Sequence, residues 1–286
     1  MRIWWTRAAR SRLSFRVRAI GSAVAISAVS LAGLPVLASA TSTVNPPYTS
    51  GTWGYDVSWP NCSTKPSIGA TVSFDIVGIG DGRPFTSSPC ASQEYLTAKQ
   101  GNITPSLYYN TGYSGAYGRD ILSVCTTTKN LTGAASLGTF PAGLKGHALS
   151  QAEQAWEIGC SEAEYGFSHA AALGSASFWW ADVETGNSWS TNTKLNQYTI
   201  DGMSYAMNVM NTNNVTDSVV GGGIYSSVGS WIKLTGSSSW APTPAAATWV
   251  ASGTCNTRSF AYSMPAVVQN PPASGVSGNV DVDEAC

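Results

Sequence analysis

The segment Phe178-Trp179-Trp180-Ala181-Asp182-Val183-Glu184 decides the fold that the sequence predicts. It is a short apolar run without polar alternation, as expected of a strand buried on both faces of a parallel sheet, and it ends in two acids. Residues two apart in a strand point to the same face, so Asp182 and Glu184 should project together, about 6 to 7 Å apart along the chain. Side chains gathered at the carboxyl ends of parallel strands are typical of a barrel.

Seven other short runs rich in Val, Ile, Tyr and Trp predict further strands. The eight expected strands are 55–58, 74–79, 106–110, 178–183, 219–225, 248–251, 266–269 and 279–283. Helices are expected over 92–100, over 193–210, and over 150–165 after a capping box formed by Ser150 and Glu153. The gaps 251–266 and 269–279 are rich in Gly, Ser and Pro and leave little room for a crossover helix. The sequence therefore predicts an α/β fold, a modified TIM-type (β/α) barrel with helices missing in the C-terminal third.

The first 40 residues have the features of a removable secretion signal. Six arginines precede an apolar run at 19–36, and the small residues Ala38 and Ala40 suit cleavage after Ala40. The alternative is a retained membrane anchor, because the run approaches the roughly 20 residues that span a bilayer. We expect a signal peptide over 1–40, a short polar tether over 41–52 and one barrel domain over 53–286, which is secreted and leaves the membrane after cleavage.

Charge and cysteine content narrow the class of protein. Without the leader, 9 basic residues face 16 acidic ones, which argues against nucleic acid as a partner. Six cysteines follow the leader, and an even number in an exported chain predicts disulfides. Six cysteines allow 15 pairings. We favour three local bridges, each joining neighbouring segments: Cys62–Cys90, Cys125–Cys160 and Cys255–Cys286. Their wide spacing does not resemble a zinc site, and we expect neither a metal nor a cofactor.

Acids lie on three of the expected strands. Asp56 is near the end of the first, Asp182 and Glu184 end the fourth, and Asp281 and Asp283 lie on the last. Carboxylates gathered in one mouth repel each other, so at least one should have a raised pKa. Glycoside hydrolysis requires this combination, because one acid must donate a proton while an ionised neighbour stabilises positive charge on the sugar ring. An acidic cluster could also bind calcium, although no segment has EF-hand spacing.

Aromatic residues accompany the acids, and their flat faces suit the apolar faces of sugars. Tryptophans in a strand are often core residues instead, and alternation lets only one of Trp179 and Trp180 point inward. A nucleophilic triad is disfavoured because no Gly-x-Ser-x-Gly elbow is present. The expected substrate-binding residues are Trp59, Tyr109, Trp180, Trp189, Tyr225 and Asp283.

Several motifs together resemble glycoside hydrolase family 25 lysozymes. In chain order these are Gly54-Tyr55-Asp56-Val57-Ser58, Ala181-Asp182-Val183-Glu184, Gly223-Ile224-Tyr225-Ser226, Trp249-Val250-Ala251 and Val280-Asp281-Val282-Asp283. The segments 56–62, 182–189 and 281–286 are similar to a secreted actinobacterial branch of glycoside-hydrolase-like domains.

The resemblance implies a modified TIM barrel that loses helices late and cleaves the β-1,4 bond after N-acetylmuramic acid in peptidoglycan. It implies Glu184 as general acid, Asp182 as the group that orients the acetamido group or stabilises the intermediate, and Asp56 and Asp281 as the rest of an acidic floor. Two segments depart from the family pattern: 59–62, where the lysozymes continue towards Gln-Gly, and 80–82, where they have a Lys-Ala-Thr-Glu-Gly-like segment.

The leading hypothesis is therefore a secreted, monomeric glycoside hydrolase that acts on cell-wall glycan, extracellular or associated with the wall. The alternative is a catalytically silent extracellular barrel that binds glycan and keeps the acids for structure. A third possibility is an exported adhesion or structural module.

Overall fold

The computed structural model describes residues 45–63, 72–210, 221–270 and 280–286. The expected signal peptide and the start of the expected tether lie outside these residues. No helix in the described part of the chain is both long and apolar enough to cross a membrane.

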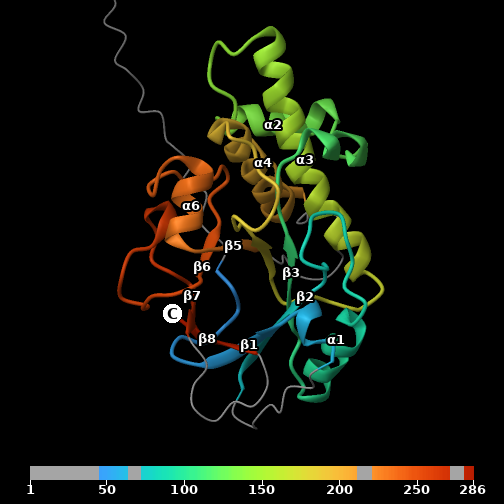
Figure 1. Ribbon diagram of the computed structural model, residues 1–286, viewed down its shortest axis with the longest axis vertical. Helices are drawn as coiled ribbons and strands as arrows, with labels where there is room; N and C mark the ends of the chain where they lie inside the picture. The colour runs from blue at the N-terminus through green and yellow to red at the C-terminus, as the bar shows by residue number, and fades with distance from the viewer. Residues whose placement is uncertain (1–44, 64–71, 211–220, 271–279) are drawn as a thin grey trace, which may run out of the picture. The chain divides into compact units, whose positions relative to one another are not determined.

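Eight strands close into a single barrel in chain order (Figure 1). The seven strands β1 to β7 pair in parallel, whereas β8 is antiparallel to both of its neighbours, β7 and β1. The strands are β1 Trp53–Val57, β2 Phe74–Gly78, β3 Ser106–Asn110, β4 Trp179–Asp182, β5 Gly222–Ser226, β6 Ala247–Val250, β7 Val267–Asn270 and β8 Asp281–Ala285. All eight expected strands are confirmed, although residues 219, 220 and 279 of two of them lie outside the described residues.

The helices cover the outside of the barrel unevenly. Figure 1 shows α3 and α4 side by side against the part of the barrel that contains β3 to β5. After β6, the only helical segment in the described residues is a 3₁₀ turn, η4 Phe260–Tyr262, so the expected loss of helices is confirmed in this part of the C-terminal third. The α-helices are α1 Ala91–Gln100, α2 Thr128–Ser136, α3 Gly146–Ala170, α4 Thr193–Tyr205, which continues as a π-helix over Ala206–Met210, and α6 Val228–Thr235.

The expected start of the longest helix is wrong. Helix α3 begins at Gly146, four residues before Ser150. The Ser150 hydroxyl donates a hydrogen bond to the Gly146 carbonyl at 3.3 Å, a bond typical of a serine inside a helix. The Ser150 and Glu153 pattern is therefore internal to α3 and caps nothing. Helices α2 and α6 were not expected, because both are short.

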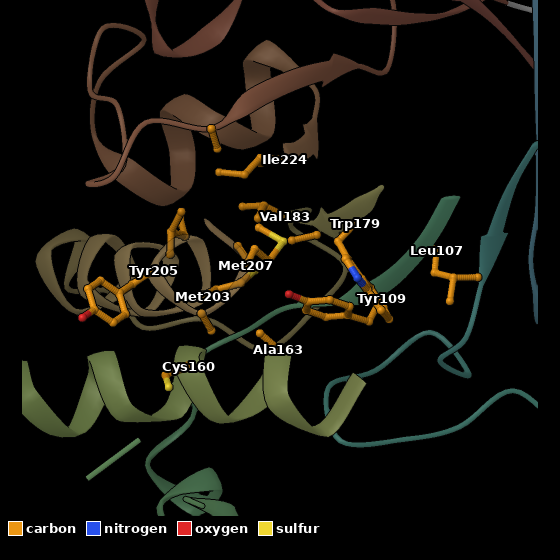
Figure 2. Packing of buried hydrophobic residues seen from close by; sticks show 14 of the residues in the cluster. Leu107, Tyr109, Cys160, Ala163, Trp179, Val183, Met203, Tyr205, Met207 and Ile224 are labelled. Atoms are coloured by element: carbon orange, nitrogen blue, oxygen red, sulfur yellow. The ribbon is translucent and has the colours of Figure 1, made fainter. Parts of the chain in front are cut away.

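Two hydrophobic layers hold the barrel. One fills its interior and includes Phe74, Trp180 and Trp249; the other lies between the strands and the helices (Figure 2). Gly223 makes room for the inner layer, because a side chain there would overlap the Trp180 ring. Between the helices, Gly159 and Gly202 allow α3 and α4 to approach so closely that a Cβ at either position would meet the backbone of the other helix.

The three disulfides join the cysteine pairs favoured above: Cys62–Cys90, Cys125–Cys160 and Cys255–Cys286. Each closes a local loop of about 30 residues in a chain whose C-terminal third has few helices. Three disulfides are typical of a protein that works in an oxidising, extracellular environment.

Candidate active site

The acids meet at one rim of the barrel, and the reversed direction of β8 decides which acid of that strand lies there. Asp56 on β1 and Asp182 at the end of β4 lie at the carboxyl end of the parallel strands. Asp281 begins β8 rather than ending it, and the antiparallel register places it opposite Asp56. The strand direction therefore brings Asp281 to the same rim, where it is exposed, and places Asp283 two residues deeper.

A cavity of about 260 Å³ opens between β1, β3 and β4 at this rim. Both acids of the Asp-x-Glu segment line it, together with Tyr108 and Asn110 from β3 and Trp59 from the loop after β1. The expectation that Asp182 and Glu184 project together is confirmed, since both side chains face one cavity.

Burial sets the protonation of these two acids. Burial raises the pKa of Asp182 to about 8, and the negative charge of Glu184 adds to the rise. The Asn110 amide donates a hydrogen bond to Asp182 Oδ2, which opposes the rise by favouring the ionised form. Burial also raises the pKa of Glu184. At least one carboxyl in the cavity is therefore protonated near neutral pH, as acid catalysis requires.

Hydrogen bonds to backbone carbonyls hold the loop that carries Glu184 in place. The Trp189 indole N–H donates to the Glu184 carbonyl at 2.7 Å, so Trp189 holds the loop and is packed against the core. The Tyr113 N–H donates to the Ser188 carbonyl at 2.7 Å, which joins the loop after β3 to the loop after β4. In turn, the buried Glu162 carboxylate on α3 accepts from the Gly112 N–H at 3.2 Å.

Asp56 lies just inside the rim, where Gln269 on β7 hydrogen-bonds to its carboxyl group. The Gln269 amide donates to Asp56 Oδ2 at 2.9 Å, and the Tyr225 hydroxyl donates to Gln269 Oε1 at 2.8 Å. Burial raises the pKa of Asp56 to about 7, helped by the charges of Asp281 and Glu184 and opposed by the Gln269 hydrogen bond.

Trp59 is the large exposed aromatic residue of the cavity, with 46% of its surface accessible. It lies on η1 (Trp59–Asn61), where Ser58 and Asn61 bond reciprocally, and the Cys62–Cys90 disulfide fixes the end of this turn. Gly82, in a left-handed conformation with φ of 88°, leaves room for the Trp59 indole.

Five of the six expected substrate-binding residues are not among those that line the cavity, and Trp59 is the exception. Trp189 holds the loop that carries Glu184, and Tyr225 bonds to Gln269 on β7. Trp180 is fully buried in the barrel interior, one inward step below Asp182. Tyr109 points outward and packs against Trp179 and α3, as Figure 2 shows, while its neighbour Tyr108 lines the cavity instead. Asp283 has no accessible surface.

Four residues that form or support the site were not predicted from the sequence: Tyr108, Asn110, Glu162 and Gln269. Asn110 and Gln269 had a usable signal, because each is a polar residue near the end of an apolar strand, like Asp182. Glu162 had none, since an acid within an amphipathic helix gives no sign that it faces inward.

No family model matches the sequence, and no curated protein matches it. Solved structures with a similar fold do exist. The lysozyme from Streptomyces coelicolor is 18% identical and matches over 83% of this chain and 93% of its own, with a TM-score of 0.46. The family GH25 lysozyme from Aspergillus fumigatus is 12% identical over 82% of this chain and 93% of its own, with a TM-score of 0.49. The muramidase from Trichobolus zukalii is 15% identical over the same shares, with a TM-score of 0.46.

Proposed function

We propose that this protein is a secreted glycoside hydrolase that cleaves the glycan of cell-wall peptidoglycan, with Glu184 as its general acid. One observation carries the proposal: Asp182 and Glu184 line a single cavity at the rim of the barrel, and burial raises the pKa of both. Such a pair supplies a protonated donor for the leaving oxygen beside a second carboxyl that stabilises charge on the sugar ring.

The roles follow from depth in the cavity. Glu184 is half-buried, so it can reach the glycosidic oxygen, whereas Asp182 is buried and fixed by Asn110. Asp182 orients the substrate acetamido group or stabilises the intermediate. Asp56 and Asp281 complete the acidic floor. Trp59 offers an exposed ring on which a sugar can stack.

The substrate class rests on the motif resemblance and on the shape of the site. A cavity of about 260 Å³ is at the small end of ligand pockets, so it holds a short part of a chain whose remainder lies along the open rim. The secretion signal expected over 1–40 and the three disulfides suit work outside the cell.

The decisive experiment compares Glu184→Gln with the unchanged protein on purified peptidoglycan. The release of reducing ends should fall about 10²- to 10⁴-fold, because the proton donor is lost. Glu153→Gln, which changes a partly exposed acid on α3, serves as the matched control and should keep full activity. Equal release from all three proteins would rule out Glu184 as the acid.

A second candidate function is a silent glycan-binding barrel. The observation that favours it is that Trp59, Gly80 and Gly82, which depart from the lysozyme pattern, all line the cavity. This candidate predicts that the unchanged protein sediments with insoluble peptidoglycan but releases no reducing ends, and that Trp59→Ala abolishes the sedimentation.

A further inference from the structure

Asp283 and Asp56 form a buried pair of carboxyl groups beneath the rim. Asp283 has no accessible surface, and on β8 it lies directly opposite Gly54 and Gln269. The Trp249 indole N–H donates to Asp283 Oδ1 at 2.8 Å. Asp283 Oδ2 receives no hydrogen bond from the nitrogen or hydroxyl donors of the described residues. The Asp283 carboxyl also lies within hydrogen-bonding distance of the Asp56 carboxyl.

Both ends of this pair have fixed donors. The Tyr225 hydroxyl bonds to Gln269 Oε1, so the Gln269 amide must point its N–H towards Asp56 Oδ2. At the other end, an indole can only donate, so Trp249 occupies Asp283 Oδ1. This leaves Asp283 Oδ2 as the oxygen of Asp283 that is free to meet the Asp56 carboxyl, and ionised carboxylates are acceptors only. The contact between the two residues is a hydrogen bond only if it holds a proton.

Within the described part of the chain, no cation lies close enough to neutralise two negative charges. The described charged groups that influence Asp56 and Asp283 are acids: Asp281 on the same strand as Asp283, and Glu184 after β4. The negative charge of Asp56 also raises the pKa of Asp182 and of Asp75, so both acids lie close to it. Two neighbouring carboxyl groups that are buried in such a site cannot both be ionised near neutral pH.

We propose that Asp56 and Asp283 share one proton, which Asp283 carries on Oδ2, and that Asp283 is a positioning residue that orients Asp56 without contacting the glycan. Burial and the charge of Asp56 raise the pKa of Asp283 well above its ordinary value, whereas hydrogen bonds from Gln269 and Asp283 favour the ionised form of Asp56. The catalytic consequence rests on the proposed function, because Asp56 belongs to its acidic floor. The shared proton itself does not.

A neutral carboxylic acid and a carboxamide have the same shape and the same hydrogen-bonding pattern. In Asp283→Asn, the amide oxygen accepts from Trp249 and the amide N–H donates to Asp56. Asp283→Leu keeps a similar volume but leaves the Trp249 N–H and Asp56 without a partner. The proposal therefore predicts that asparagine replaces Asp283 and leucine does not. Asp281→Asn, at the exposed start of β8, is the matched control.

The experiment measures the melting temperature at pH 5 and, at pH 7, the infrared carbonyl band of protonated carboxyl groups. Asp283→Asn should melt within about 2 °C of the unchanged protein at pH 5, whereas Asp283→Leu should melt about 5 °C lower or fail to fold. At pH 7 the infrared difference between the unchanged protein and Asp283→Asn should show one protonated carboxyl lost, and Asp281→Asn should show no such loss.

Two results would overturn the proposal: Asp283→Asn as unstable as Asp283→Leu, or no protonated carboxyl lost in Asp283→Asn at pH 7. If the unchanged protein cleaves glycan, Asp283→Asn should keep kcat/KM within about threefold and Asp283→Leu, where it folds, should lose at least about tenfold. Absence of cleavage in the unchanged protein would overturn the proposed function alone, because the infrared and melting results need no substrate.

Discussion

Replacing Asp75 by Asn should make the protein's stability less dependent on pH. Asp75 on β2 lies opposite Tyr55 on β1, and both point outward towards α1, where Glu94 is buried. The Tyr55 hydroxyl donates to Asp75 Oδ2 at 2.6 Å. Burial, together with the charges of Asp56 and Glu94, raises the pKa of Asp75 from 3.8 to about 8.

The sign follows from the direction of this shift. A raised pKa means that the folded state prefers the protonated acid, so its contribution to stability is complete below pH 3.8 and is lost as the pH rises towards 8. Within that window the loss is about 1.4 kcal/mol per pH unit, or about 2.7 kcal/mol between pH 5 and pH 7. Asn keeps an acceptor for Tyr55 and cannot ionise. Between pH 5 and pH 7, the free energy of unfolding of Asp75→Asn should therefore rise by about 2 to 3 kcal/mol relative to that of the unchanged protein.

Urea denaturation followed by tryptophan fluorescence at pH 5, 6 and 7 measures the difference directly. Asp120→Asn, at a partly exposed carboxyl beside Arg119, is the control and should shift the curve equally at every pH. If Asp75→Asn and the unchanged protein differ by the same amount at pH 5 and pH 7, within about 0.5 kcal/mol, Asp75 is ionised in the fold and the reasoning fails.

Three further changes test other parts of the structure. Trp59→Ala should raise KM for soluble glycan about five- to tenfold with little change in kcat, because stacking is worth about 1 kcal/mol in both the bound and transition states; a change confined to kcat would contradict it. Gly202→Ala should lower the free energy of unfolding by about 3 kcal/mol in urea denaturation, since its Cβ would meet the Trp156 carbonyl, and an unchanged midpoint would refute the close helix contact. Serine at both Cys125 and Cys160 should cost about 3 to 4 kcal/mol by the same assay, because the bridge closes a loop of 35 residues, and no loss would show that it carries no stability.

The sequence was sufficient to place the strands, because each apolar run is short and bounded by polar segments. It was also sufficient for the two acids after β4, since residues two apart share a face. The same rule could not decide which of two adjacent aromatic residues points into the barrel. In Tyr108-Tyr109 and in Trp179-Trp180 either member satisfies the period of two, so composition gives no sign of which one points inward.

The register decides what composition leaves open. Tyr108 pairs with Trp180, and Asn110 pairs with Asp182, so all four belong to the inward face. On that face, the position of a residue along the barrel axis then decides whether it belongs to the core or to the site. Trp180 is one step below the rim and fully buried, while Asp182 reaches the cavity. This position depends on where neighbouring strands begin, which is a property of the closed barrel rather than of any one segment.

Strand direction has the same effect on the acids of β8. In a parallel strand, Asp283 would lie at the rim and Asp281 beneath it; because β8 is antiparallel, Asp281 is exposed and Asp283 is fully buried next to Asp56. Residue composition does not encode this direction. Yet it determines which carboxyl can keep a proton, since burial is the largest cause of the raised pKa of Asp283. The reversal of one strand therefore separates the two acids of β8 by depth. Asp283, beneath the rim, is the one that can keep a proton, and its hydrogen bond favours the ionised form of Asp56, whose negative charge would stabilise a developing positive charge on a sugar ring.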